Sequence, residues 1–247
     1  NIPLIKAGQI VSEACYSMPV LPVTVKIRVK LFLEGFLKPD GSMQTTYQEE
    51  GMLPLEQPYG NSGFSYFGSE SVMEFEDDIV DWILLELWNQ NNIVIKQQAV
   101  LLRKDGWLVD LEGNNEILLQ DFYPEPTNLV IYHRSHLGVY IKRQITPNTI
   151  DTQTIDITTS DANVLGKSQL KMVHGRFALI AGDVDQNGLI DTRDFDQLSE
   201  ASKTAGMQYE NADLNADGMV DDSDLMLWQQ NRSKIGYPGV HKILKNS

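Results

Sequence analysis

Alternating apolar and polar residues mark the first clear element of the chain. From Val23 to Leu33 every odd-numbered position is apolar, while Lys26, Arg28 and Lys30 lie between them. Successive side chains of a strand point to opposite faces of a sheet. The pattern therefore predicts a half-buried β-strand over this range.

Short apolar runs continue through most of the chain. Residues 82–88 and 93–102 flank an Asn-Gln-Asn-Asn turn and predict a β-hairpin. Residues 51–71 are predicted as an irregular loop, and residues 146–170 as an edge strand and loop. Further strands are expected at 107–111, 129–133, 139–145 and 177–180. Seven or more short strands with regular turn signals predict a mainly β fold, a β-sandwich.

The composition changes at Ala181-Gly182, where β-branched runs give way to Asp-rich segments and helix formers. We therefore predict a β-sandwich domain with an N-terminal extension at 1–180, a calcium-binding module at 181–236 and a C-terminal tail at 237–247. The net charge is −14, and residues 183–224 contain 12 acidic and two basic residues. This concentration of negative charge indicates a bound cation, and the overall balance argues against a nucleic-acid partner.

The chemistry-bearing motif is a twelve-residue loop from Asp183 to Asp194. Oxygen side chains occupy its positions one, three, five, nine and twelve, Gly188 occupies position six, and a backbone carbonyl is available at position seven. Calcium takes six to eight oxygen ligands, and this spacing wraps a short loop around one ion. The predicted ligands are Asp183, Asp185, Asn187, Leu189 through its carbonyl, Asp191 and Asp194.

The same pattern recurs thirty residues later, which predicts a second calcium ion. Its ligands are Asp213, Asn215, Asp217, Met219 through its carbonyl, Asp221 and Asp224. Each loop is followed by a predicted helix with apolar residues at helical spacing, namely Phe195, Leu198, Leu225 and Trp228. Ile190 and Val220, at position eight of each loop, are expected to pair as a short bridge. The alternative is that both loops are solvated Asp-Gly turns without an ion.

With Asp at the twelfth position and one helix after each loop, residues 181–236 resemble dockerin repeats. The resemblance implies a small α-helical pair of EF-hand-like calcium repeats that docks a cohesin-like partner. The positions that often contact that partner hold Thr192-Arg193 and Asp222-Ser223 in place of a Ser-Thr-like pair. Structural calcium binding is therefore the primary expectation, and docking the alternative.

The upstream region resembles segments of large secreted bacterial surface proteins that precede such repeats. The similarity rests on stretches such as 29–35, 53–59, 81–87 and 133–137. It implies an Ig-like or prealbumin/Cna-B-like sandwich, located outside the cell or at its surface. The protein is thus expected to be a non-catalytic, extracellular attachment module for a protein partner or cell-surface component.

Three other sets of residues are weaker candidates. His133 and His136 have the spacing of a transition-metal pair, although a strand would leave one packed and one exposed. A polysaccharide-active or polysaccharide-binding protein is the remaining alternative, with paired acids or stacking aromatics. The acids are Glu74, Glu76, Asp77, Asp78, Asp81 and Glu86, and the aromatics are Tyr59, Phe64, Tyr66 and Phe67. No apolar run reaches the length of a membrane span.

Overall fold

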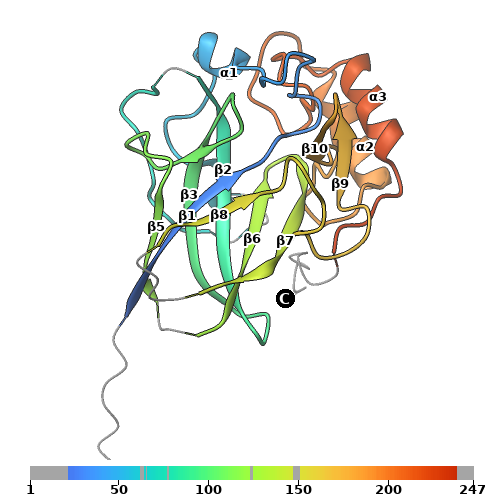
Figure 1. Cartoon of the computed structure of the whole chain (residues 1–247). Helices are drawn as coiled ribbons and strands as arrows, with labels where there is room; N and C mark the ends of the chain where they lie inside the picture. The colour runs from blue at the N-terminus through green and yellow to red at the C-terminus, as the bar shows by residue number, and fades with distance from the viewer. Residues whose placement is uncertain are drawn as a thin grey trace, which may run out of the picture.

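The computed structural model describes residues 22–61, 64, 66–76, 78–122, 125–146 and 151–237. Asp77 and nearly all of the predicted N-terminal extension and C-terminal tail lie outside these residues. Two β-sheets face each other in a sandwich-like arrangement, and the helices α2 and α3 lie together at one side beside the hairpin β9–β10 (Figure 1). The mainly β fold predicted from the sequence is confirmed.

The first sheet has three strands in the order β5-β1-β8. Strand β1 (Val23–Lys30) pairs antiparallel with β5 (Ile117–Phe122) and parallel with β8 (Gln153–Asp156). The odd-numbered residues of β1 are buried, as the alternation predicts. Strand β8 confirms the expected edge strand, whereas β5 was not predicted.

The second sheet is antiparallel in the order β4-β3-β2-β6-β7. Strands β2 (Ile79–Asn89) and β3 (Val94–Arg103) form the predicted hairpin. Every residue of β2 is buried, because this central strand is covered on both faces. The remaining strands are β4 (Leu108–Val109), β6 (Thr127–His133) and β7 (His136–Ile145).

A small hairpin connects the sandwich to the C-terminal segment, residues 181–237. It consists of β9 (Leu170–Val173), which was not predicted, and β10 (Arg176–Leu179). Leu179 N–H donates to Phe32 O (2.8 Å), and Leu137 N–H donates to Ile180 O (2.9 Å). The chain thus enters the Asp-rich segment fixed to both sheets.

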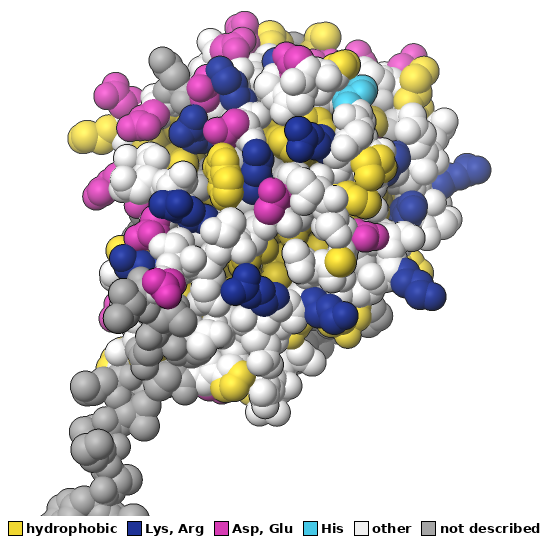
Figure 2. All heavy atoms as spheres, viewed as in Figure 1, with side chains coloured by type: hydrophobic (Ala, Val, Ile, Leu, Met, Phe, Trp, Pro, Cys, Tyr) yellow, Lys and Arg dark blue, Asp and Glu magenta, His cyan; other side chains and the backbone are white. Residues whose placement is uncertain are grey.

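The helices are short, and the described residues contain three α-helices and one 3-10 turn. Helix α1 spans Thr46–Glu49, the 3-10 turn Pro58–Asn61, α2 Thr192–Ala201 and α3 Asp222–Asn231. None of the described helices is long and apolar enough to cross a membrane. On the face shown in Figure 2, Lys and Arg side chains are scattered among acidic and uncharged ones.

The interior has two apolar clusters. The larger fills the sandwich, with Trp82 and Ile27 fully buried at its centre. The smaller lies under the C-terminal segment, where Leu198 of α2 and Trp228 of α3 pack in the same cluster as Leu137 of β7. The C-terminal helices therefore pack against β7 of the sandwich, in a cluster separate from the sandwich core.

Candidate metal centre

The first loop folds through hydrogen bonds that its own sequence dictates. Gly188 has φ +81°, a conformation that favours glycine, and its N–H donates to both carboxylate oxygens of Asp183 (3.2 and 3.1 Å). Asp191 is the N-cap of α2, and Asp194 completes the capping box from inside the helix. The loop is thereby closed on itself at the start of α2.

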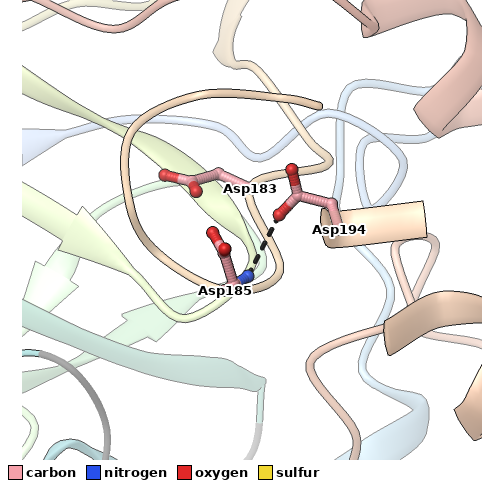
Figure 3. Close-up of side chains that lie close together, drawn as sticks. All are labelled: Asp183, Asp185 and Asp194. Atoms are coloured by element: carbon pink, nitrogen blue, oxygen red, sulfur yellow. Dashed lines mark hydrogen bonds between the residues drawn. The ribbon is translucent and has the colours of Figure 1, made fainter. Parts of the chain in front are cut away.

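Three carboxylates converge inside this loop. Asp183, Asp185 and Asp194 each offer one oxygen, and these oxygens all lie within 4.8 Å of one another. Figure 3 shows the three side chains around the interior of the loop, with Asp194 at the beginning of the helix. Asp183 is 3% exposed and Asp194 is fully buried, so water screens their charges poorly.

The environment raises the pKa of these carboxyls. Burial, followed by the charge of Asp194, raises the pKa of Asp183 well above its ordinary value. Burial also raises the pKa of Asp194 to about 6, although the N–H groups of Val184 (2.7 Å), Asp185 (3.1 Å) and Asp191 (2.8 Å) donate to it. The loop interior therefore favours a compensating positive charge.

The other predicted ligands of the first loop make different contacts. Asn187 donates from Nδ2 to Asp185 (2.6 Å) and accepts from Leu189 N–H (2.8 Å), so both residues line the loop. Asp191 accepts from the Arg193 side chain (2.7 Å), which lowers the pKa of Asp191. The structure thus brings together Asp183, Asp185 and Asp194, while Asp191 is engaged by Arg193.

The second loop repeats the same pattern of hydrogen bonds. Gly218 has φ +88° and its N–H donates to Asp213 Oδ2 (2.7 Å). Leu214 N–H donates to Asp224 (2.7 Å), as Val184 does to Asp194 in the first loop. Asp221 is the N-cap of α3 and forms a capping box with Asp224. Two segments with different apolar residues therefore adopt one backbone arrangement.

The first and last acids of the second loop are also buried. Asp213 and Asp224 are fully buried, and burial raises the pKa of Asp224 to about 7. Burial raises the pKa of Asp213 as well, against the lowering effect of the nearby Tyr47 hydroxyl. Asp213 Oδ1 has no hydrogen-bond partner among the residues that the structure describes. An uncompensated buried carboxylate oxygen is costly unless a cation neutralises it.

Asn215, Asp217 and Met219 complete the second loop. Asn215 donates from Nδ2 to Asp217 Oδ2 (2.9 Å), while Asp217 Oδ1 accepts from Met219 N–H (2.9 Å). Asp221 accepts from Ser223 N–H (2.8 Å), and hydrogen bonds from Ser223 lower the pKa of Asp221. The second loop has Asn at position three and Asp at position five, the reverse of Asp185 and Asn187 in the first loop, so both loops have the same number of acidic ligands.

A buried polar network beneath the loops was missed by the sequence analysis. Asp81 on β2 accepts from Arg134 Nε (3.0 Å) and from the Tyr209 hydroxyl (2.6 Å), and lies 3.1 Å from His133 Nε2. Although burial alone raises it, the charge of Arg134 and the hydrogen bond with His133 hold the pKa of Asp81 well below its ordinary value. The sequence feature that could have indicated this network is the position of Asp81 inside an apolar run.

A second buried acid, after Asp81, is Glu34, which follows β1 and is 2% exposed. Its carboxylate accepts from Asn231 Nδ2 of α3 (2.6 Å) and from Ala181 N–H (3.1 Å), and it forms an ion pair with Lys171. One buried carboxylate thus joins β9, the entry to the first loop and the end of α3.

The histidine pair differs from the predicted arrangement of one packed and one exposed ring. His133 and His136 are both buried, at the ends of β6 and β7, with their Nδ1 atoms 2.8 Å apart. Burial lowers the pKa of both rings. The tight turn between the strands brings both residues to the same side, which an extended-strand rule does not anticipate.

The candidate carbohydrate residues do not form an open site. Tyr59, Phe64 and Tyr66 are buried, and only Phe67 is exposed (87%). The acidic run divides into exposed residues, Glu74 and Glu76, and two fully buried acids with internal partners, Asp81 and Glu86. The three buried aromatics therefore serve the core, and the buried acids are engaged by internal partners rather than lining an open site.

The predicted bridge between Ile190 and Val220 does not form. Ile190 N–H donates to Lys234 O (3.0 Å), and its carbonyl accepts from Ser233 N–H (2.8 Å). Leu189 forms a β-bridge with Ile235 instead. The segment after α3 returns to the first loop and occupies the backbone groups that a partner loop would need.

Comparisons with known proteins find little. No family model matches the chain, and no curated protein is detectably similar. Similar solved structures include two of mutant type II cohesin–X-dockerin complexes from Acetivibrio cellulolyticus. One has a TM-score of 0.42 at 13% identity, covering 86% of this chain and 97% of that chain. The other has a TM-score of 0.39 at 13% identity, covering 87% and 97%. Similarity at this level leaves the family open.

The structure shows that the identification of a dockerin-type repeat pair behind a surface-protein β-domain is wrong. The described chain is mostly β, with three short helices, and α2 and α3 are not a separate helical pair. They pack in one cluster with Leu137 and Ile180, and α3 is tied to Glu34 by Asn231. The loop motif alone, without these long-range contacts, made the segment resemble a pair of dockerin repeats.

Proposed function

We propose that the protein is a non-catalytic calcium-binding module, in which one calcium ion in each loop holds residues 183–224 in place. The observation that carries the proposal is the convergence of Asp183, Asp185 and Asp194 in a buried loop. Calcium fits because the donors are all oxygen atoms and the loops offer backbone carbonyls at position seven. The alternative of an ion-free solvated turn fits poorly, since the first and last acids of each loop are buried.

Calcium would neutralise a substantial repulsion. Two unit charges at 4.8 Å, the upper limit for the separations in the cluster, repel by about 3 kcal/mol at an effective dielectric constant of about 20. The C-terminal segment packs against Leu137 of β7, so relief of this repulsion stabilises the attachment of the segment as well as the loop. Calcium is thus a structural component in this proposal.

Titration calorimetry of the full chain with calcium tests the proposal. We expect two binding sites, with one lost in Asp194→Asn. The matched control is Asp196→Asn, which removes the same charge from an exposed position on the same helix and should retain both sites. Absence of binding heat, supported by an unchanged unfolding midpoint in calcium and in chelator, would refute calcium binding.

An extracellular location remains part of the proposal. Calcium sites of extracellular modules have dissociation constants of roughly 10⁻⁴–10⁻³ M, whereas cytosolic sensors bind far more tightly. Weak calcium affinity is therefore expected. Submicromolar affinity for both loops would argue against the extracellular assignment while leaving calcium binding intact.

A second candidate function is attachment to a protein partner at the C-terminal helices. A groove of about 470 Å³ lies between α2 and α3, lined by apolar Phe195, Val220 and Leu225 and by acidic Asp221 and Asp222. Such a lining fits a partner with an apolar anchor flanked by basic residues.

Photo-crosslinking from position 195 in the presence of calcium, against surface proteins of the source organism, tests this candidate. The control is position 118 on β5, where an exposed leucine lies far along the chain from the groove. A specific product from position 195 that disappears with chelator is expected. Equal products from both positions would exclude the groove as a docking site.

A further inference from the structure

The turn between β6 and β7 lies against the first loop. Ser135 O accepts from Gly182 N–H (2.9 Å), directly before the loop begins. Arg134 O accepts from Gln186 Nε2 (2.6 Å), a buried contact at the fourth position of the loop. Gln186 is not one of the predicted ligands. Its side chain therefore links the backbone of the first loop to the backbone of the turn.

The side chain of the same arginine reaches the second loop. Arg134 Nη1 donates to Glu210 O, and the guanidinium lies 4.0 Å from the centre of the Tyr209 ring. Glu210 O also accepts from Asp213 N–H (3.2 Å), and Asp213 is the first predicted ligand of the second loop. Arg134 thus holds the carbonyl that positions the start of that loop.

Arg134 is well suited to transmit a displacement. It is 2% exposed and paired with the fully buried Asp81, so its side chain has little freedom to move independently of its backbone. The direct bridge between Ile190 and Val220 is absent, because residues 233 and 234 occupy Ile190. A contiguous route from one loop to the other therefore runs from Gln186 through Arg134 to Glu210.

We propose that Arg134 is a positioning residue that couples the two calcium sites. The inference rests on the proposed calcium binding and adds that occupation of the first loop strengthens binding at the second. Calcium in the first loop fixes Gln186, which fixes the Arg134 carbonyl and, through the side chain, the Glu210 carbonyl. The ordering needed at Asp213 is then already in place when the second ion arrives.

The same regions are also connected by apolar packing, with Val184 and Leu214 in one cluster, and by two other hydrogen bonds. Asn211 Nδ2 lies at 3.5 Å from Val184 O, and Trp228 Nε1 donates to Asp191 O (3.2 Å). The first is long, and the second joins α3 rather than the start of the second loop to the first loop. Trp228→Phe removes the indole donor and retains an aromatic ring, which makes it the comparison variant for the Arg134 route.

The test measures the affinity of the second loop for calcium by titration calorimetry of the full chain. Asp183→Asn disables the first loop while keeping an oxygen that accepts from Gly188 N–H. The coupling factor is the dissociation constant of the second loop in this variant divided by its value in the otherwise unaltered chain. Asp213→Asn disables the second loop, so its titration reports the calcium affinity of the first loop alone.

The variant that interrupts the route is Gln186→Ala. The second loop already carries Ala216 at the equivalent position with φ +56°, close to the +61° of Gln186, so alanine is compatible with this backbone. We expect a coupling factor of roughly five or more in the unaltered chain. It should fall close to one in Gln186→Ala and persist in Trp228→Phe.

The outcomes separate this inference from the function on which it rests. Two sites with a coupling factor of one in the unaltered chain overturn the coupling and leave calcium binding standing. A factor that survives Gln186→Ala, or that is lost in Trp228→Phe alone, shows that Arg134 is not the link. Absence of any calcium binding overturns both proposals.

Discussion

Replacing Asp185 by Asn changes the stability of the protein in opposite senses with and without calcium. At pH 8 and without calcium, the substitution removes the repulsion between Asp185 and Asp194, which is about 3 kcal/mol for charges 4.8 Å apart at an effective dielectric constant of about 20. Arg193, 3.9 Å from Asp185, already offsets part of this repulsion.

The substitution also has a cost. Asn187 Nδ2 donates to Asp185 Oδ2 (2.6 Å), and loss of such a hydrogen bond costs about 1 kcal/mol. The net expectation in chelator is an increase of about 1–2 kcal/mol in the free energy of unfolding. With calcium present the variant lacks a charged ligand, and each tenfold loss of affinity removes about 1.4 kcal/mol of calcium-dependent stabilisation.

Urea unfolding followed by circular dichroism, in excess EDTA and in excess calcium, measures both effects. The matched control is the double variant Asp185→Asn/Asn187→Asp, which restores the charge and reproduces the order of Asn215 and Asp217 in the second loop. This double variant should recover most of the increase in the free energy of unfolding that calcium causes. A single variant that is less stable than the unaltered protein in EDTA would refute the electrostatic reasoning.

Three further predictions concern pH, the buried network and the loop turn. Because Asp194 and Asp224 have raised pKa values of about 6 and 7, calcium affinity measured by calorimetry should fall as the pH is lowered from 8 to 5.5. In EDTA their contribution to stability is fully present below about pH 4 and is lost as pH rises through 6 to 7, which urea unfolding at several pH values checks. Asp81→Asn leaves the charge of Arg134 unpaired and should lower the free energy of unfolding by about 3–5 kcal/mol; a loss below 1 kcal/mol would show that the pair is dispensable. Gly188→Ala places a side chain at φ +81° and should cost about 1–2 kcal/mol by urea unfolding, and an unchanged midpoint would contradict the strain argument.

The regular parts of the fold could be predicted from the sequence because they depend on neighbouring residues. The alternation from Val23 predicts β1, and the two apolar runs around residues 89–92 predict the hairpin β2–β3. The loops could be located from ligand spacing and Gly188 alone. Whether they bind calcium, and whether 180/181 is a domain boundary, stay predictions.

The rest depended on contacts that lie far apart along the chain. Asp81 and Arg134 are 53 residues apart, and Asp81 and Tyr209 are 128 residues apart, so no local pattern marks them as partners. Short strands such as β9 carry too few residues for a periodic signal. The packing of Trp228 with the sandwich depends on the same tertiary context, and motif spacing alone misassigned the segment.

The bridge between Leu189 and Ile235 makes the folding of the first loop depend on residues near the end of the chain. Three backbone hydrogen bonds of the first loop use partners at residues 233–236, beyond the second loop and its helix. During synthesis, these backbone groups of the first loop therefore stay unpaired until residues 233–236 have been made. A proteolytic cut just before residue 233 would consequently damage the loop that lies farther from the cut along the chain.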